Sequence, residues 1–398
     1  MTTTPHIVFA GGGALGNLYP GLAIAEILAQ QLPDVRITFL GDGRPIERDT
    51  VTGWGWRYMA APGMRTPLGP LRATADMTIG KWVARWMLSE HQVSLVVGLG
   101  GPATRPALAA AQSRGLPNIL LETNAEPPAA HCRLAKRANL TCVAFEEARS
   151  RLPIDAALAI TGAPGRGGFE RIYSRRAAPR LAQTGFSRPR EKRLVVIGGV
   201  GGATSLNDHT PSALACLGKE LDGWRVIHQS GAGRLRETEN RYQRAGVDAL
   251  VVTYLDEMAA VCEEADLVVC RAGGATLAEL ALAGLPAVLV PDGRPSGGSQ
   301  LRNAQIYQRE GACRVIDEAA LKNPQTADRS ARDLSVALAR ELRPLLVDDA
   351  QRSSLAGGML AMARPGAAAQ IAAACGELIE TAAPTRGLAV AAPRPQAA

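Results

Sequence analysis

The sequence is poor in aromatic residues and has no long hydrophobic run. Phe, Trp and Tyr make up 4% of the 398 residues, and no basic run is interleaved with aromatic side chains, which argues against a nucleic-acid partner. No stretch of about 18 apolar residues occurs, so we expect no membrane-spanning helix. The opening MTTTPH has no basic segment followed by an apolar one, so no secretion signal is predicted.

Cysteine pairs with the spacing of metal sites are also missing. The odd number and the wide spacing of the cysteines predict a reducing compartment and argue against both a zinc site and a disulfide framework. The seven are Cys132, Cys142, Cys216, Cys262, Cys270, Cys313 and Cys375.

The residues that are present favour two α/β domains. A chain of 398 residues is too long for one ordinary core, and 46% hydrophobic residues with 42 glycines fit helices packed closely on sheets. The formal net charge is +7, from 44 Lys and Arg against 37 Asp and Glu. This basic excess favours an anionic ligand or an anionic membrane surface.

One strand, turn and helix organise the rest of the chain. The apolar run Leu267 to Cys270 is followed by the pair Gly273–Gly274, and helical spacing resumes from Thr276 to Leu282. A helix that begins after a glycine turn points free N–H groups into the turn, where a diphosphate can bind. The carboxylate of Glu279 can accept both hydroxyls of a ribose. The alternative is an ordinary βαβ unit with a surface glutamate.

The pattern of strand, glycine or polar loop, and helix recurs along the chain. Parallel strands joined by helices form open sheets, and ligands gather at the carboxyl ends of such strands. The first helix is expected from about Tyr19 to Gln30. The other predicted strands are Ile7–Ala10, Val35–Leu40, Leu95–Leu99, Asn118–Glu122, a strand that begins at Leu194, Trp224–His228, Ala249–Val252, Ala287–Val290 and Cys313–Ile316.

Several motifs in one order resemble those of the MurG family. They are the opening GGGALGNLYPGLA, HQSGAG from His228, YLDEM from Tyr254, and the strand, turn and helix described above. That family transfers N-acetylglucosamine from UDP-N-acetylglucosamine to lipid I, undecaprenyl-pyrophosphoryl-N-acetylmuramoyl-pentapeptide, and so forms lipid II in peptidoglycan synthesis. The resemblance extends to about Leu378 and implies the GT-B fold, an α/β fold of two Rossmann-like domains with parallel sheets facing across a cleft. It also implies an inverting reaction that needs neither metal nor cofactor.

The resemblance and the composition together give a domain plan. We expect an acceptor-binding domain over residues 1–163, a basic, proline-containing linker over 164–192 and a UDP-sugar-binding domain over 193–363. A helix over 364–383 is expected to return to the first domain. The low-complexity tail 384–398 is expected to be disordered.

The resemblance places the donor in the second domain. The backbone of Leu255 is expected to read the uracil edge, and Glu279 is expected to hold the ribose. The turn at Gly274 is expected to face the diphosphate together with Arg166. Polar side chains of the next helix and one across the cleft contact the sugar in the family. The full set of matching positions is Asn124, Arg166, Leu255, Gly274, Thr276, Glu279, Gln300 and Asn303.

Two donor loops depart from the family. The glycine loop after the first strand of the second domain has Val200 and Gly201 where the family has Ser-Gln, which removes a hydroxyl and an amide from this expected contact. The loop DGRPSGG has also lost an acidic pair that family members often have before the glutamine.

The acceptor loops depart further. The first glycine loop, which contains Gly13 and Gly16, has Asn17 where the family has a histidine, and Ala14 replaces a threonine. The second loop, GGPATRP, keeps a hydroxyl at Thr104. An amide has no useful basicity near neutral pH, so Asn17 can orient an acceptor hydroxyl but cannot take its proton.

A carboxylate is therefore the expected base, if any group serves. Glu47 in GDGRPIERD matches a position where the family also has glutamate, and Glu122 and Glu126 are the other candidates. For each of them a solvated surface carboxylate is the alternative.

An apolar helical face bears on location. Ile79, Trp82, Val83 and Trp86 fall at i, i+3, i+4 and i+7, with basic residues beside them. Such a face suits the surface of an anionic bilayer, and the resembling enzymes are peripheral proteins on the cytoplasmic face of the cell membrane. The alternative is that this face packs on the sheet.

Three alternatives to the lipid I transferase stay open. The chain can be a transferase with the same donor and another acceptor, because the substitutions cluster in the acceptor loops. It can be a binding module that holds UDP-sugar or lipid-linked precursor without turnover, as the loss of the histidine allows. A sugar-nucleotide epimerase shares the two-domain plan but fits the motifs less well.

Replacing Trp82 and Trp86 by serine tests where the apolar face lies. On a bilayer-facing helix the rings contact lipid. The double variant should then bind anionic vesicles less than the wild type does, and its melting temperature should not change. Vesicle sedimentation and thermal unfolding measure the two quantities. A large fall in melting temperature would show instead that the rings are core, because emptying a buried aromatic site costs about 3–5 kcal/mol.

Overall fold

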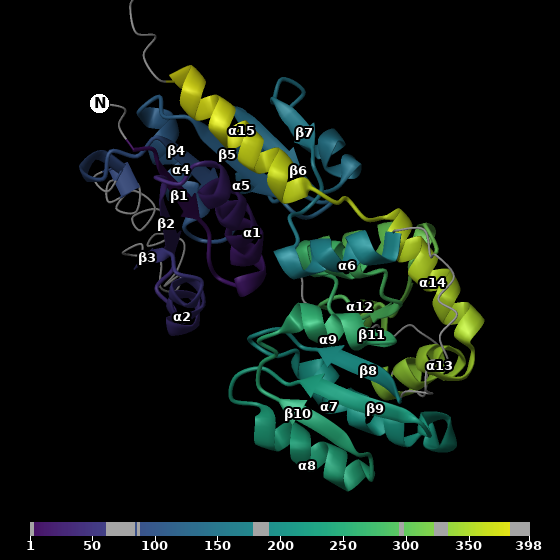
Figure 1. Ribbon diagram of the computed structural model, residues 1–398. Coiled ribbons are helices and arrows are strands. Elements are labelled where there is room, and N and C mark those ends of the chain that lie inside the picture. Colours follow the sequence, from purple (N-terminus) through teal and green to yellow (C-terminus); the bar gives the residue numbers. More distant parts are fainter. Residues whose placement is uncertain are drawn as a thin grey trace, which may run out of the picture.

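The computed structural model describes residues 4–60, 84–85, 88–177, 191–293, 298–321 and 333–382. Within these residues the chain forms two domains, each with a parallel sheet and helices (Figure 1). The α/β class and the two-sheet plan expected from the sequence are confirmed. The apolar face at Ile79, Trp82, Val83 and Trp86 and the tail 384–398 lie outside the described residues.

The first sheet has the strand order β3-β2-β1-β4-β5-β6-β7, and all of its neighbours pair in parallel. Its strands are β1 His6–Ala10, β2 Arg36–Gly41, β3 Arg57–Ala60, β4 Leu95–Gly98, β5 Asn118–Glu122, β6 Leu140–Val143 and β7 Leu158–Ile160. The helices that follow these strands include α1 Leu15–Gln31, α2 Pro45–Gly53, α4 Thr104–Ser113, α5 Ala129–Ala135 and the 3-10 helix η1 Glu146–Arg151.

The second sheet has the order β10-β9-β8-β11-β12-β13, again with parallel pairing. Its strands are β8 Lys192–Ile197, β9 Trp224–Gln229, β10 Ala249–Val252, β11 Leu267–Cys270, β12 Ala287–Leu289 and β13 Cys313–Val315. The helices are α6 Gly167–Ala177, α7 Thr204–Ala215, η2 Gly218–Leu221, α8 Leu235–Ala245, α9 Met258–Glu264, α10 Gly274–Ala283, α11 Gly298–Arg309, α12 Glu318–Leu321, α13 Leu334–Val347, α14 Asp349–Ala361 and α15 Ala367–Ala382.

Burial explains why the sequence predicted the central strands but not some of the others. Strands β1, β4, β5 and β11 are buried along their whole length, as expected for parallel strands covered on both faces. Strand β3 is an edge strand with exposed ends, and β6 and β7 have 4 and 3 residues. None of the three is a continuous buried apolar run, since β6 contains Thr141 and β7 is only half-buried, so the sequence did not predict them.

Helix α1 begins four residues before the predicted start at Tyr19. The sequence predicted this helix from the helical spacing of Ile24, Ile27 and Leu28, which does not mark its first turn. In the structure the glycine turn leads directly into Leu15, and Pro20 lies inside the helix. The helix N-terminus therefore lies at the glycine loop itself.

Each sheet reverses its strand order beside its first strand. In the first sheet β1 lies between β2 and β4, and in the second β8 lies between β9 and β11. The loops that follow β1 and β4, and those that follow β8 and β11, leave the sheets at these switch points. Open α/β sheets bind their ligands there.

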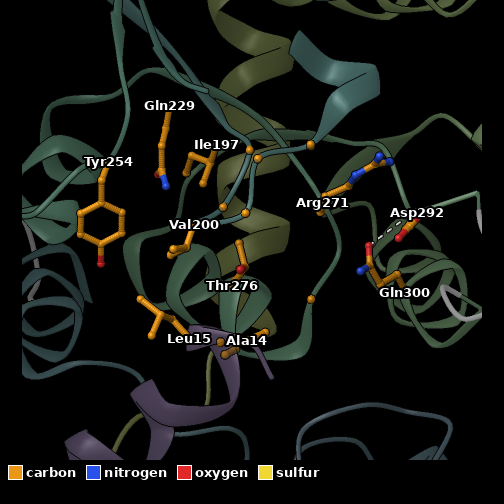
Figure 2. Close-up of a pocket in the computed structure, with 18 of the residues that line it drawn as sticks. Ala14, Leu15, Ile197, Val200, Gln229, Tyr254, Arg271, Thr276, Asp292 and Gln300 are labelled. Carbon is orange, nitrogen blue, oxygen red and sulfur yellow. Dashed lines mark hydrogen bonds between the residues drawn. The ribbon is translucent and has the colours of Figure 1, made fainter. Parts of the chain in front are cut away.

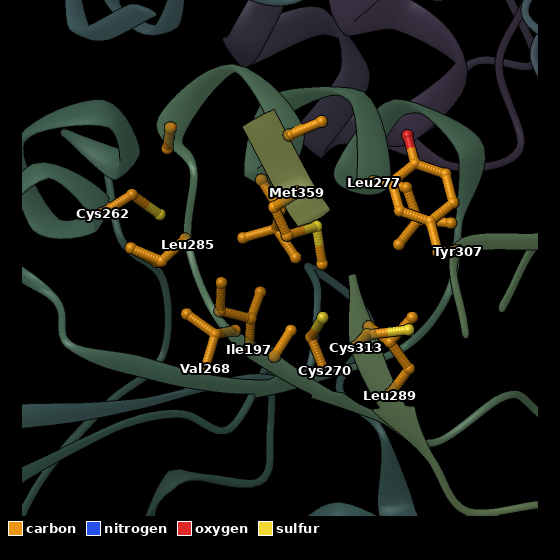
Figure 3. Close-up of a cluster of buried hydrophobic side chains, with 14 of the residues drawn as sticks. Ile197, Cys262, Val268, Cys270, Leu277, Leu285, Leu289, Tyr307, Cys313 and Met359 are labelled. Carbon is orange, nitrogen blue, oxygen red and sulfur yellow. The ribbon is translucent and has the colours of Figure 1, made fainter. Parts of the chain in front are cut away.

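A core cluster of the second domain also includes residues of the segment that was expected to link the domains. Phe169 and Ile172 of α6 are buried in this cluster with residues of β11, α10 and α14. Figure 3 shows Met359 of α14 between the strand residues and Leu277 of α10. Burial raises the pKa of the Cys262 and Cys313 thiols to about 12, so both are protonated and unreactive at neutral pH.

Helix α15 covers the first domain, whereas α14 before it belongs to the second (Figure 1). Four residues of α15, Ala368, Ile371, Ala372 and Cys375, are buried in the same cluster as apolar residues of α1. The chain therefore passes from the first domain to the second and back.

Replacing Ile371 by alanine should weaken this docking. The side chain is 0% exposed, and truncating a buried isoleucine costs about 2–5 kcal/mol of unfolding free energy. Glu377→Ala on the exposed face of the same helix is the matched control and should change the unfolding free energy by less than about 0.5 kcal/mol. Urea denaturation measures both. Equal stabilities of the two variants would contradict the packing described here.

Candidate active site

The two domains enclose a cleft with a volume of about 980 Å³. Residues of the loop after β1 and of α2 line one side, and the loops that follow β8, β10 and β11 line the other. Figure 2 shows Ala14 and Leu15 of the first domain opposite Val200 and Thr276 of the second. The cleft thus lies where the switch points of both sheets meet.

Three helices begin at this cleft with free backbone N–H groups. They are α1, α7 and α10, and in each the residue before the first turn makes no side-chain capping bond. None of the three has an acidic residue in its first turn. Unpaired N–H groups and the positive ends of three helix dipoles make this cleft an anion-binding site.

Many of the positions predicted from the sequence line this cleft. They are Gly13, Gly16, Glu47, Arg166, Val200, Gly201, Thr276, Glu279 and Gln300. The other predicted positions are not among the lining residues: Asn17, Thr104, Asn124, Leu255, Gly274 and Asn303. Leu255 is buried in the hydrophobic cluster of the second domain, which leaves its backbone as the group available to a ligand.

Arg166 and Glu279, which were predicted to bind different parts of a nucleotide, are paired with each other. Arg166 Nε and Nη2 donate to the two carboxylate oxygens of Glu279 at 2.6 and 2.7 Å. Both side chains are largely buried, and two parallel bonds fix their geometry. The guanidinium carbon also lies 4.2 Å from the centroid of the Tyr19 ring. The pair is therefore held in place before any ligand binds.

Two tyrosines that the sequence did not single out as site residues join the domains across the cleft. The Tyr19 and Tyr254 hydroxyls are hydrogen-bonded to each other. Burial raises the pKa of Tyr19 to about 12, with Arg166 opposing the shift, so the hydroxyl keeps its proton at neutral pH. Both tyrosines belong to motifs that carry the family resemblance, Tyr254 to YLDEM and Tyr19 to the opening motif, but the sequence predicted a role for neither of them.

Gln229, the last residue of β9, also lines the cleft. Its Oε1 is buried and accepts no hydrogen bond from the described residues. Figure 2 shows the side chain pointing into the cleft between Ile197 and Tyr254. An unpaired buried oxygen costs about 1–3 kcal/mol, which a donor on a ligand would offset. A polar residue at the carboxyl end of a buried strand was the sequence signal for it.

Glu47 holds the first glycine loop. One carboxylate oxygen accepts from the backbone N–H of Gly13 at 2.8 Å, and the other accepts from the N–H of Asp42 at 3.0 Å and the hydroxyl of Tyr58 at 2.8 Å. Burial, followed by the neighbouring Asp42 carboxyl group, raises the pKa of Glu47. The carboxylate ties the loop after β1 to the loop after β2.

Asn17 and Thr104 hold the two acceptor loops together. Asn17 Nδ2 donates to the carbonyl of Gly12 at 2.8 Å. Thr104 Oγ1 donates to the carbonyl of Ala10 and accepts from the N–H of Gly100, both at 2.8 Å. Both side chains that were predicted to meet substrate therefore bond to backbone in this structure.

Asn124 and Asn303 bridge the two domains directly. Asn303 accepts from the N–H of Ala125 at 2.8 Å, and its Nδ2 donates to Asn124 Oδ1 at 3.0 Å and to the Ala272 carbonyl at 3.1 Å. Beside them, a Cβ added to Gly274 would lie 1.7 Å from the carbonyl oxygen of Thr123, so only glycine fits there.

No group of three or more His, Cys, Asp or Glu side chains is arranged to hold a metal ion in the part of the chain that the structure describes. In the same residues no helix combines the length and the apolar character needed to cross a bilayer.

Comparison with known proteins gives the family. Residues 7–142 match the glycosyltransferase family 28 N-terminal domain, and residues 193–334 match the glycosyltransferase family 28 C-terminal domain. The crystal structure of Acinetobacter baumannii MurG has a TM-score of 0.68 with this chain at 22% identity, covering 95% of this chain and 99% of that one. This likeness confirms the GT-B fold expected from the sequence.

Two curated relatives are called UDP-N-acetylglucosamine--N-acetylmuramyl-(pentapeptide) pyrophosphoryl-undecaprenol N-acetylglucosamine transferase. The protein of Trichlorobacter lovleyi is 32% identical over 340 residues, which cover 82% of this chain and 89% of the relative. The protein of Syntrophotalea carbinolica is 33% identical over 377 residues, which cover 93% and 98%. With this identity over nearly its whole length, the chain belongs to the MurG family of glycosyltransferases.

Proposed function

We propose that the protein transfers N-acetylglucosamine from UDP-N-acetylglucosamine to lipid I and so forms lipid II, with inversion at the anomeric carbon and without a metal ion. The observation that carries the proposal is the cleft into which three uncapped helix N-termini open. Two pyrophosphates meet in this reaction, one in the donor and one in the acceptor. The names of the relatives support the same pair of substrates.

The donor pyrophosphate binds at the N-terminus of α10, where Gly273, Ala275 and Thr276 line the cleft. The free N–H groups stabilise the negative charge that grows on UDP as the sugar leaves, which is the task that a metal ion performs in other transferases. Arg271 lines the same turn, but its guanidinium is bonded to Glu318, Ser205 and two backbone carbonyls. It therefore acts by shaping the turn.

The ribose binds at Glu279 and the uracil at Leu255. The side chain of Arg166 donates to each oxygen of Glu279, and its backbone N–H donates to Oε1 at 3.4 Å. A carboxylate has about four lone-pair sites, so one remains, on Oε2, for a ribose hydroxyl. Gln229 faces the same end of the cleft with an unpaired oxygen. Val200 and Gly201 leave this pocket without the hydroxyl and amide that the family has there.

The acceptor binds over the glycine loops of the first domain. Gly13 and Gly16 line the cleft at the N-terminus of α1, where free N–H groups suit the pyrophosphate of a lipid-linked sugar. The three hydrogen bonds of Glu47 support a role in holding this loop. Its raised pKa is also compatible with the role of base that we expected for it.

The site of action is the cytoplasmic face of the cell membrane, where the protein binds peripherally. The net charge of +7 and the apolar face with Trp82 and Trp86 support binding to an anionic bilayer.

Glu279→Ala tests the donor site. Losing a charged acceptor for the ribose should weaken UDP-N-acetylglucosamine binding by about tenfold to a hundredfold, as calorimetry can measure. Glu239→Ala, a carboxylate of α8 that does not line the cleft, is the matched control and should bind as the wild type does. If Glu279→Ala binds UDP-N-acetylglucosamine as tightly as the wild type does, the ribose does not bind at Glu279.

Incubation of the wild type with labelled UDP-N-acetylglucosamine and lipid I tests the reaction itself. We expect labelled lipid II, because the diphosphate site is complete. Binding of the donor without transfer to lipid I or to any other lipid-linked sugar would favour the binding module. Transfer to another lipid-linked sugar but not to lipid I would favour a different acceptor.

A further inference from the structure

A buried imidazole and carboxylate pair lies at the acceptor loops and has no role in the reaction as described above. His131 is in the first turn of α5, and Glu122 is the last residue of β5. His131 Nδ1 lies 2.5 Å from Glu122 Oε2. The side chains are 11% and 1% exposed. A pair of this kind orients an imidazole and fixes its tautomer.

The hydrogen bonds of Glu122 define the protonation of the pair. Its other oxygen, Oε1, accepts from the backbone N–H and from Nδ2 of Asn124, at 2.8 and 3.1 Å. Glu122 is thus the acceptor in every bond, and Nδ1 of His131 carries the proton that it shares. Nε2 is then the nitrogen with a free lone pair, and no described residue donates to it.

The imidazole lies beside the second acceptor loop. A Cβ added to Gly100 would lie 3.7 Å from His131 Cε1 and 3.6 Å from Asn17 Oδ1. Cε1 lies between the two ring nitrogens, so this edge of the ring also carries Nε2. The loops meet at this place, because a Cβ on Gly101 would lie 2.0 Å from the Gly12 carbonyl oxygen. His131 and Asn17 therefore flank one glycine at the junction of the two loops.

None of the other four histidines offers a free nitrogen at these loops, and one of them, His91, precedes β4, whereas the second acceptor loop follows that strand. His6 bonds through both ring nitrogens to the His91 carbonyl and Thr38, and His228 bonds through both to Tyr242 and Asn207. His209 is on α7 of the second domain, beside Ser335 and Asp333.

We propose that His131, held by Glu122, is the base of the transfer reaction in place of Glu47, whose oxygens hold the first glycine loop, and that it replaces the histidine that this chain lacks at position 17. The proposal rests on the proposed function. The acceptor hydroxyl gives its proton to His131 Nε2 as its oxygen forms a bond to the anomeric carbon. The bond from that carbon to the diphosphate breaks, and its electron pair leaves with UDP. Glu122 stabilises the imidazolium that forms.

Among the described residues, few charged groups surround the pair. Glu122 on β5 is the charged group in contact with the ring. The neighbouring elements carry Arg105 on α4, Glu126 after β5 and Arg133 on α5. Of these, Glu126 is 3.7 Å from Arg151, which offsets its charge.

His131→Asn is the first test, with donor and lipid I at saturation. Loss of a general base should lower kcat by about a hundredfold to ten-thousandfold and leave donor affinity within about twofold of the wild type. His91→Asn, which removes a histidine elsewhere in the same domain, is the control and should keep its kcat. The double variant His131→Asn with Asn17→His returns an imidazole to the same junction. Its kcat should be at least about tenfold higher than that of His131→Asn alone.

Glu122→Gln is the second test and serves even where His131→Asn does not fold. An amide can still accept from Nδ1 but carries no charge to stabilise the imidazolium that forms in the reaction. Glu122→Gln should therefore lower kcat and leave donor affinity within about twofold of the wild type, and Glu122→Asp should recover part of the lost kcat. An unchanged kcat of Glu122→Gln would overturn the proposal, as would a His131→Asn variant with the kcat of the wild type.

The same assays separate this inference from the function on which it rests. If the wild type and His131→Asn transfer the sugar equally well, His131 is not the base, but the protein is still a transferase. If the wild type transfers no sugar under any condition, both proposals are wrong.

Discussion

The cleft depends on helices that begin without caps. A helix leaves its first four N–H groups without partners, and most helices satisfy some of them with a serine, threonine or aspartate side chain. Here Ala14, Ala203 and Gly273 stand at those positions on α1, α7 and α10. Helices α13 and α14, which begin away from the cleft, are capped by Asp333 and Asp348. Helices α2, α4, α5, α8 and α9 also begin without a side-chain cap, but α1, α7 and α10 direct their unsatisfied groups into the cleft, where an anion can satisfy them.

The sequence predicted the fold well because buried parallel strands are continuous apolar runs bounded by glycine loops. It failed where that signal is weak, at β3, β6 and β7, and it placed the start of α1 too late, because the spacing of Ile24, Ile27 and Leu28 does not mark the first turn. Loop positions such as Gly13 and Thr276 could be assigned to the cleft because each follows a strand end. Contacts between segments far apart in sequence could not. Nothing in the spacing pairs Arg166 with Glu279, or His131 with Glu122.

The donor and acceptor sites share one hydrogen-bonded chain. His131 bonds to Glu122, Glu122 to Asn124, Asn124 to Asn303, and Asn303 to the carbonyl of Ala272, in the turn before α10. The turn that faces the donor pyrophosphate is thus connected to His131 and the acceptor loops through Glu122, Asn124 and Asn303. Reorientation of one domain against the other would change these bonds, so the alignment of the two substrates is sensitive to the asparagine bridge.

Because α15 returns to the first domain, the two domains are joined twice, once by the chain near Gly165 and once by the docking of α15. A protease cut in the connection near Gly165 would leave two fragments that still hold together, because α15 remains attached to the second domain while its apolar face stays on α1. Conversely, a first domain expressed alone would expose the face of α1 that Ile371 and Cys375 cover, and such a fragment would tend to aggregate. A split version of this protein that reassembles should therefore be divided within the connection, with α15 kept on the second fragment.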